Sequence, residues 1–267
     1  MVAEMLETSD KVKLYLQIDS VEDPKAVVIL VHGLCEHCGR YDYVTYRLNE
    51  AGYSVYRFDH RGHGRSEGKK VYYDSWEQIS DDVYVVFRKA KQENPGKKLY
   101  VLGHSMGGYA AVCFGTRFPD AAAGMILSGA LTRYHTQCAG TLPINVPLDM
   151  YVPNALGEGV CTDPQVTKAY EKDPLVAKEI SIGLLNSMYT GVGCLKEHAA
   201  EFTAPVLILH GCNDGIVSPL DSMELFQEIG SVDKSLRIYA HLFHEIFNEP
   251  VKGQILDDVL LWLSTRV

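Results

Sequence analysis

The chain lacks an uninterrupted apolar run of roughly 18 residues, so we expect no transmembrane helix. It also lacks a basic run, and its net charge of −9 makes nucleic acid and anionic membranes poor electrostatic partners. The opening residues MVAEMLETSDKVK contain acidic side chains where a signal peptide needs a basic flank and an apolar core. These absences argue against nucleic-acid-binding, membrane-spanning and secreted proteins.

A disulfide framework and a metal site are also not expected. The seven cysteines are odd in number and scattered, which favours reduced thiols and a cytoplasmic location. His241 with His244, and the run Cys35 to Cys38, superficially resemble metal ligands. Neither set has a zinc-binding spacing or further ligands to complete it, so we expect no metal.

Strand-like and helix-like runs alternate along the 267 residues, which suffice for one large core. The expected strands are 26–31, 53–58, 99–102, 124–128, 205–209 and 235–239. The expected helices are 41–51, 79–93, 106–118, 220–229 and 252–264. Several strands are apolar without alternation, as parallel strands covered on both faces are. The pattern predicts an α/β fold with a doubly wound, mostly parallel sheet.

One segment of about 75 residues, between Ser128 and Pro205, breaks this alternation. It far exceeds the roughly 2–6 residues of ordinary α/β loops. Its first part, 142–156, is apolar and rich in proline, and its second part has a helical pattern. We expect 131–200 to form a mainly helical cap on a core of 1–130 and 201–267, at the sheet edge where ligands bind. The alternative is a second packing layer without a substrate role.

The sequence GHSMGG, residues 103–108, lies between an expected strand and an expected helix. This is the order of a nucleophile elbow, G-x-S-x-G, which presents a serine at a helix N-terminus. A Cβ at Gly103 or Gly107 would collide with the neighbouring strand or helix. Ser105 is therefore the candidate nucleophile for acyl transfer.

A serine nucleophile needs a histidine base and an orienting carboxylate. Asp214 follows the strand PVLIL and is favoured over Asp221, which falls at a helix start where acidic residues usually cap. Two histidines follow the strand SLRIY. We favour His244, in the loop before the last helix, over His241, which is closer to the strand end.

Stabilisation of an oxyanion requires two backbone N–H groups. One is expected from Met106, directly after the nucleophile, and the other from Leu34, in the loop after the strand AVVILV. In the same loop, Glu36 and Arg40 are expected to form a structural ion pair. The segment 59–66, DHRGHGRS, is interpreted as a braced loop beneath the site, with substrate contact as the alternative.

Six motifs together resemble the monoacylglycerol lipase and lysophospholipase branch of the α/β hydrolases, often labelled serine aminopeptidase-like. They extend over much of the chain: HGLCEHCGRY (32–41), FDHRGHGRSEG (58–68), GHSMGG (103–108), TDPQVTKAYEKDPLV (162–176), HGCNDGIV (210–217) and HEIFNE (244–249). The last motif is what selects His244 over His241. Two departures stand out: Cys35 replaces a small residue of the family pattern, where it would narrow the loop or expose a thiol, and His241 lies near a position often held by glycine.

The resemblance implies the α/β-hydrolase fold and a serine ester hydrolase that needs no cofactor. Its implied substrates are monoacylglycerols or lysophospholipids, cleaved through an acyl-enzyme on Ser105, His244 and Asp214. The alternative is a general or feruloyl-type carboxylesterase, or a thioesterase, acting on small esters. The expected partner is a small acyl ester, with at most weak peripheral membrane contact through 142–156. The sequence carries no signal for the oligomeric state.

Overall fold

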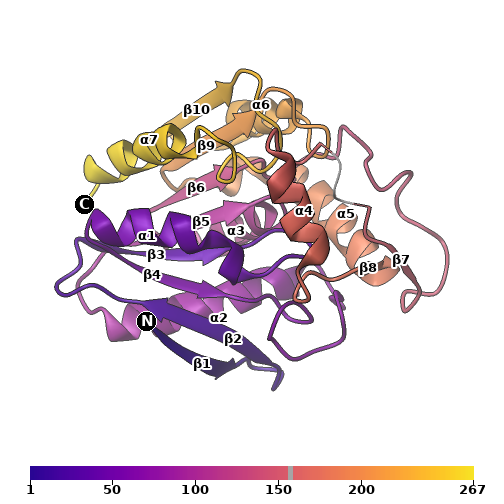
Figure 1. Ribbon diagram of the computed structural model, residues 1–267, viewed down its shortest axis with the longest axis horizontal. Helices are drawn as coiled ribbons and strands as arrows, with labels where there is room; N and C mark the ends of the chain where they lie inside the picture. The colour runs from indigo at the N-terminus through magenta and orange to yellow at the C-terminus, as the bar shows by residue number, and fades with distance from the viewer. Residues whose placement is uncertain (156–158) are drawn as a thin grey trace.

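A mixed sheet of eight strands forms the centre of the structure, a computed structural model that describes residues 1–155 and 159–267 (Figure 1). The strand order is β1-β2-β4-β3-β5-β6-β9-β10, and neighbours from β4 to β10 pair in parallel. The bounds are β1 Val2–Glu7, β2 Lys13–Asp19, β3 Ala26–Val31, β4 Tyr53–Phe58, β5 Leu99–His104, β6 Gly124–Ser128, β9 Val206–Gly211 and β10 Lys234–Tyr239.

Helices cover both faces of this sheet. One face packs against α1 (Asp42–Glu50) and α7 (Lys252–Ser264), and the other against α2 (Glu77–Glu93), α3 (Met106–Arg117) and α6 (Pro219–Glu228). Every residue of β3 is buried, and successive residues enter the two apolar cores alternately. Burial on both faces explains the continuous apolar strands, and the predicted doubly wound sheet is confirmed.

The antiparallel pair β1 and β2 was not predicted from the sequence. Strand β1 lies at the edge of the sheet, and both strands interrupt their apolar residues with charged or polar ones, VAEMLE in β1 and KLYLQID in β2. Strand β5 is two residues longer than the predicted 99–102 and carries the chain directly to Ser105. The sheet therefore delivers the candidate nucleophile at its C-terminal edge.

In its described residues, the segment between β6 and β9 contains the α-helices α4 and α5, a short 3-10 helix (Ala199–Glu201) and a small antiparallel sheet of β7 and β8. The two α-helices and the small sheet lie together beyond one end of the main sheet in Figure 1. Its elements are β7 Tyr151–Pro153, α4 Pro164–Lys172, β8 Glu179–Ser181 and α5 Ile182–Glu197. Residues 131–150 contain no helix or strand. The apolar stretch expected over 142–156 ends at Leu156, which lies outside the described residues.

The turn at Ser105 depends on two glycines without side chains. A Cβ on Gly103 would overlap the carbonyl of Gly107, and a Cβ on Gly107 would overlap the carbonyl of Val31 at the end of β3. Both collisions involve backbone, which cannot move aside as a flexible side chain can. The close approach of α3 to β3 and β5 therefore requires glycine, as predicted.

We predict opposite effects for two Gly→Ala substitutions within helices. Gly107→Ala should lower the free energy of unfolding by about 1–3 kcal/mol, because the added methyl group overpacks the elbow. The matched control is Gly193→Ala in α5, where the new Cβ meets no heavy atom within 4 Å outside the helix. It should raise stability by about 0.5–1 kcal/mol. Urea denaturation measures both, and equal effects would contradict this account of the elbow.

Candidate active site

Ser105 is held in a strained backbone conformation between β5 and α3. Its φ of 55° lies in the left-handed region that non-glycine residues seldom adopt. The N–H of Ser105 donates to the carbonyl of Ser128 at 2.9 Å, and its own carbonyl accepts from the N–H groups of Tyr109 and Leu131 at 3.0 and 3.3 Å. Three backbone bonds thus maintain a geometry of the kind found at functional sites.

A buried hydrogen bond joins Asp214 to His244. Nδ1 of His244 lies 2.6 Å from Oδ2 of Asp214, which follows β9, whereas His244 lies between β10 and α7. The other oxygen, Oδ1, accepts from the N–H groups of Ile216 and Val217, each at 2.9 Å. The carboxylate is therefore fixed, and it orients the imidazole so that Nε2 remains for a second partner.

The two alternative residues lie elsewhere. His241 is exposed, and its φ of 65° is one that glycine adopts more readily. Asp221 is buried, but its carboxylate accepts the backbone N–H groups of residues 133–135 in the loop after β6. Of the four candidate residues, Asp214 and His244 are therefore the two that hydrogen-bond to each other.

The charges around His244 favour its protonated form. Burial alone would lower the pKa of His244, but the Asp214 carboxylate, with smaller contributions from Glu245 and Glu36, raises this pKa above its ordinary value of 6.5. The neighbouring ring of His104, whose centroid is 4.6 Å away, behaves differently. Burial lowers the pKa of His104 to about 3, so this ring is neutral and adds no competing charge.

Ser105 and His244 line one small cavity, together with Gly33 and Leu34 of the loop after β3. Leu34 and Met106 also line a larger cavity that Ser105 shares. Met106 is the first residue of α3, and the first N–H groups of a helix have no partner within it. Four of the five predicted site residues therefore line two adjoining cavities, and the fifth, Asp214, is hydrogen-bonded to His244.

A buried ion network connects the loop after β3 to the loop that carries His244. Glu36 accepts the N–H of Gly33 at 2.6 Å and lies 2.6 Å from Nη1 of Arg40, which confirms the predicted ion pair. Arg40 in turn makes two hydrogen bonds of 2.8 Å to the carboxylate of Glu245. Its guanidinium lies 4.9 Å from the ring centre of Tyr170 in α4, so the network reaches the inserted segment.

The neighbouring residues of this loop have separate partners. Nε2 of His37 lies 2.8 Å from Oδ2 of Asp173, just after α4. The carbonyl of Cys35 accepts the N–H of Ala177 at 2.8 Å, and the Cys35 side chain is fully buried. Burial raises the pKa of the Cys35 thiol, so the expectation of an exposed thiol at this position is wrong. Both contacts join the loop to the inserted segment.

The segment 59–66 is braced from within, as interpreted from the sequence. Asp59 accepts the N–H of Cys38 at 2.8 Å and so supports the loop after β3, which carries Glu36 and Arg40. Arg61 makes two hydrogen bonds, of 2.8 and 2.7 Å, to the buried carboxylate of Asp82 in α2. These charges are satisfied inside the protein, which favours a structural role.

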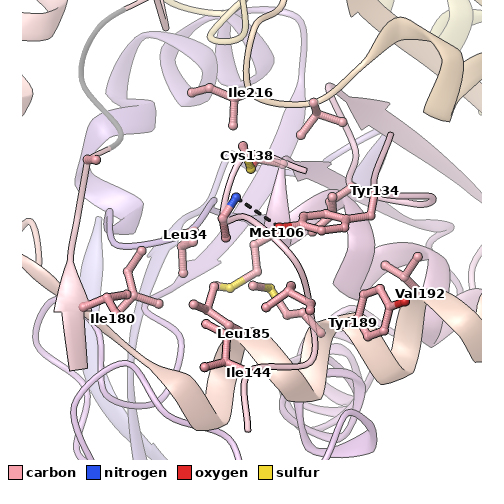
Figure 2. A pocket seen from close by; sticks show the side chains of 18 of the residues that line it. Leu34, Met106, Tyr134, Cys138, Ile144, Ile180, Leu185, Tyr189, Val192 and Ile216 are labelled. Carbon is pink, nitrogen blue, oxygen red and sulfur yellow. Dashed lines mark hydrogen bonds between the residues drawn. The ribbon is translucent and has the colours of Figure 1, made fainter. Parts of the chain in front are cut away.

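The larger cavity has a volume of about 520 Å³ and is predominantly apolar. Figure 2 shows core residues and residues of the inserted segment facing one another across it. Its apolar lining includes Leu34, Met106, Leu131, Leu142, Ile144, Val152, Ile180, Leu185, Met188, Val192, Ile216 and Val217. Its size lies within the usual range for small-molecule sites, and its lining suits a hydrocarbon chain.

His210 is a site residue that the sequence analysis did not single out. Its Nε2 lies 3.0 Å from Oδ2 of Asp214, and its Nδ1 lies 2.7 Å from the hydroxyl of Ser222. Burial opposes ionisation of Asp214, but His244 and His210 together hold the pKa of this carboxyl well below its usual range. His210 could have been found from the sequence, because it ends the apolar part of strand β9 and lies four residues before Asp214 in the motif HGCNDGIV.

Removal of the positive charge of Arg40 should destabilise the protein, because Glu36 and Glu245 would remain buried without their partner. Arg40→Gln leaves two buried carboxylates without their partner and should lower the free energy of unfolding by about 3–5 kcal/mol. The control is Arg47→Gln, which breaks the more exposed pair with Asp257 and should cost at most about 1 kcal/mol. Chemical denaturation measures both, and similar losses in the two variants would refute the network's role.

Comparisons with known proteins agree with this geometry. Residues 22–251 match the family model described as serine aminopeptidase, S33. The monoacylglycerol lipase of Mycolicibacterium smegmatis is 36% identical over 257 residues, which are 92% of this chain and 90% of that protein. A crystal structure of Paleococcus ferrophilus monoacylglycerol lipase has a TM-score of 0.84 and 30% identity, and covers 95% of this chain and 99% of its own. A soluble variant of the Saccharomyces cerevisiae monoglyceride lipase shares the fold. Its TM-score is 0.87 at 24% identity, and the match covers 100% of this chain and 96% of that one. The protein thus has the α/β-hydrolase fold and belongs to the serine aminopeptidase S33 family.

Proposed function

We propose that this protein is a serine hydrolase that cleaves monoacylglycerols to fatty acid and glycerol, and that lysophospholipids are a related class of substrate. The observation that carries the proposal is the apolar cavity of about 520 Å³ that Ser105 lines beside His244. An acyl chain in this cavity would bring its ester carbonyl to the serine. The similarity to proteins named monoacylglycerol lipase supports the same substrate class.

The proposed reaction proceeds through an acyl-enzyme. Nε2 of neutral His244 takes the proton of Ser105, whose oxygen attacks the ester carbonyl. Asp214, hydrogen-bonded to Nδ1, stabilises the imidazolium that forms. The N–H groups of Leu34 and Met106 are the proposed donors to the oxyanion. The tetrahedral intermediate collapses, and the imidazolium gives its proton to the departing glycerol oxygen. Water then repeats the sequence and releases the fatty acid.

We also propose that residues 131–200 act as a cap on a core of 1–130 and 201–267. Ile180 and Leu185 of this segment line the same cavity as Leu34 and Met106 of the core, so the acyl chain would contact both parts (Figure 2). The contacts of His37 and Arg40 with the segment around α4 support a cap that is fixed to the oxyanion loop.

Contact with lipid surfaces is proposed to be weak and peripheral. Val146, Leu148 and Met150 are 41–50% exposed on the irregular part of the inserted segment. Among the helices in the described parts of the chain, none has the length and apolar character needed to cross a membrane. A cytoplasmic location is proposed from the seven cysteines, all of which are free thiols.

A graded ester series tests the proposed function. Steady-state hydrolysis is measured over a series of pH values from neutral to alkaline. Activity should rise with pH, because the base must be neutral and the Asp214 carboxylate raises the pKa of His244 above 6.5. The series runs from acetyl to oleoyl, as nitrophenyl esters and as monoacylglycerols. We expect kcat/KM to be highest for medium or long acyl chains on glycerol. Activity confined to short or aromatic acyl groups would instead favour the general or feruloyl-type carboxylesterase.

Three variants test the catalytic assignments in the same assay. Ser105→Ala and His244→Ala should each lower kcat by at least about 10⁴-fold, because each removes a group that acts in the transition state. His241→Ala should have a mild effect, because its exposed side chain lies outside the pair with Asp214. A severe loss in His241→Ala with an active His244→Ala would show that the wrong histidine was chosen.

A further inference from the structure

A third cavity, of about 500 Å³, is formed by the loop after β6 and by α5, with Glu224 contributed by α6. It differs from the apolar cavity in its chemistry. Its polar lining residues are Arg133, His135, Gln137, Thr190, Lys196 and Glu224. Tyr134, Tyr189 and Val192 line both cavities. These three residues therefore separate a hydrocarbon-like space from one lined by charged groups.

The two tyrosines contact each other from different segments. Tyr134 lies in the loop after β6, and Tyr189 lies on α5. Their ring centroids are 6.0 Å apart with an interplanar angle of 75°, which is an edge-to-face contact. Figure 2 shows both rings on one side of the apolar cavity, with Val192 close by. The pair forms an aromatic partition across the boundary between the cavities.

Tyr134 is fixed in place at both ends. Its backbone has a φ of 97°, which a tyrosine adopts only when its surroundings impose it. The carboxylate of Asp221 accepts the N–H groups of Arg133 and Tyr134 at 2.9 and 3.0 Å. The hydroxyl of Tyr134 accepts the N–H of Ala139 at 3.0 Å and donates to the carbonyl of Gly140 at 2.9 Å. The strained loop thus holds one ring of the partition rigidly.

We propose that Tyr134 and Tyr189 are the residues that determine the longest acyl chain this enzyme accepts. The inference rests on the proposed function, in which the apolar cavity holds the acyl chain. A chain that fits within the apolar cavity gains the full benefit of burial. A longer chain must displace the partition and place its end among the charged groups of Arg133, Lys196 and Glu224. Acyl-length selectivity is therefore set at this wall.

The hydrophobic effect gives the selectivity a measurable form. Each methylene group that becomes buried should raise kcat/KM by about fourfold. The rise should stop at the chain length whose end reaches the tyrosines. Tyr189 suits substitution because it is 40% exposed on a helix, where alanine is well tolerated. Removal of its ring opens the partition and leaves the rigid Tyr134 loop intact.

The experiment compares chain-length profiles from octanoyl to stearoyl monoacylglycerols for wild type, Tyr189→Ala and Tyr189→Phe. We expect the break in the Tyr189→Ala profile to move to longer chains. The ratio of kcat/KM for the longest and shortest chains should then rise by at least about tenfold. Tyr189→Phe keeps the ring and should keep the wild-type break. Tyr46→Ala, which removes an exposed tyrosine on α1, is the matched control and should also keep it.

Two results would overturn the proposal. A Tyr189→Ala profile that coincides with the wild-type profile would show that the partition does not limit the chain. An equal increase in kcat/KM at every chain length would show that the third cavity is an entrance and not a region beyond the two tyrosines.

A binding measurement separates this inference from the proposed function. Saturated fatty acids of increasing length displace a fluorescent probe from Ser105→Ala and from the double variant Ser105→Ala/Tyr189→Ala. The affinity should rise with length and then level off, and the double variant should level off at a longer chain. This shift does not depend on catalysis, so it would stand even if no ester were hydrolysed. Identical profiles would refute the partition alone.

Discussion

The guanidinium of Arg40 holds together three parts of the protein that must agree in position. It binds Glu36, which fixes the loop of Gly33 and Leu34, and Glu245, which is the residue after His244. Through its contact with Tyr170 it also reaches α4. Because these groups are buried, the loss of any charged member would leave another charge buried without a partner. The proposed oxyanion loop, the proposed base and the inserted segment are therefore positioned by one cluster of charges.

The parallel sheet supplies the other part of the geometry. The loop of Leu34, Ser105 and Asp214 directly follow β3, β5 and β9, and His244 lies in the loop after β10. Parallel strands end at one edge of a sheet, so four loops distant in sequence meet there. The inserted segment contributes many of the residues that line the apolar cavity, from β7, β8, α5 and the irregular stretch before them. In the proposed function, the strand ends therefore position the reactive groups, and the inserted segment supplies much of the space for the acyl chain.

The elements predicted best were those with strong local patterns. Ser105 could be located because glycines flank it between an apolar strand and a helix, and Asp214 because it follows another apolar strand. The edge strand β1 could not be predicted, since it buries too little surface to leave a pattern. The partition of Tyr134 and Tyr189 was equally hidden. The two tyrosines meet where an irregular loop, held by the buried carboxylate of Asp221, packs against α5. A contact between residues so far apart in the sequence leaves no periodic pattern from which it could be predicted.

We propose that acyl groups from monoacylglycerols are transferred to the oxygen of Ser105 before water releases them. The direct measurement is rapid acid quenching of the protein during turnover of monooleoylglycerol, followed by proteolysis and mass spectrometry. We expect an oleoyl group on the peptide that contains Ser105, and no adduct in Ser105→Ala. An oleoyl group on another residue, such as Cys138 in the same cavity, would contradict the account. Release of oleate without any adduct on Ser105 would contradict it as well.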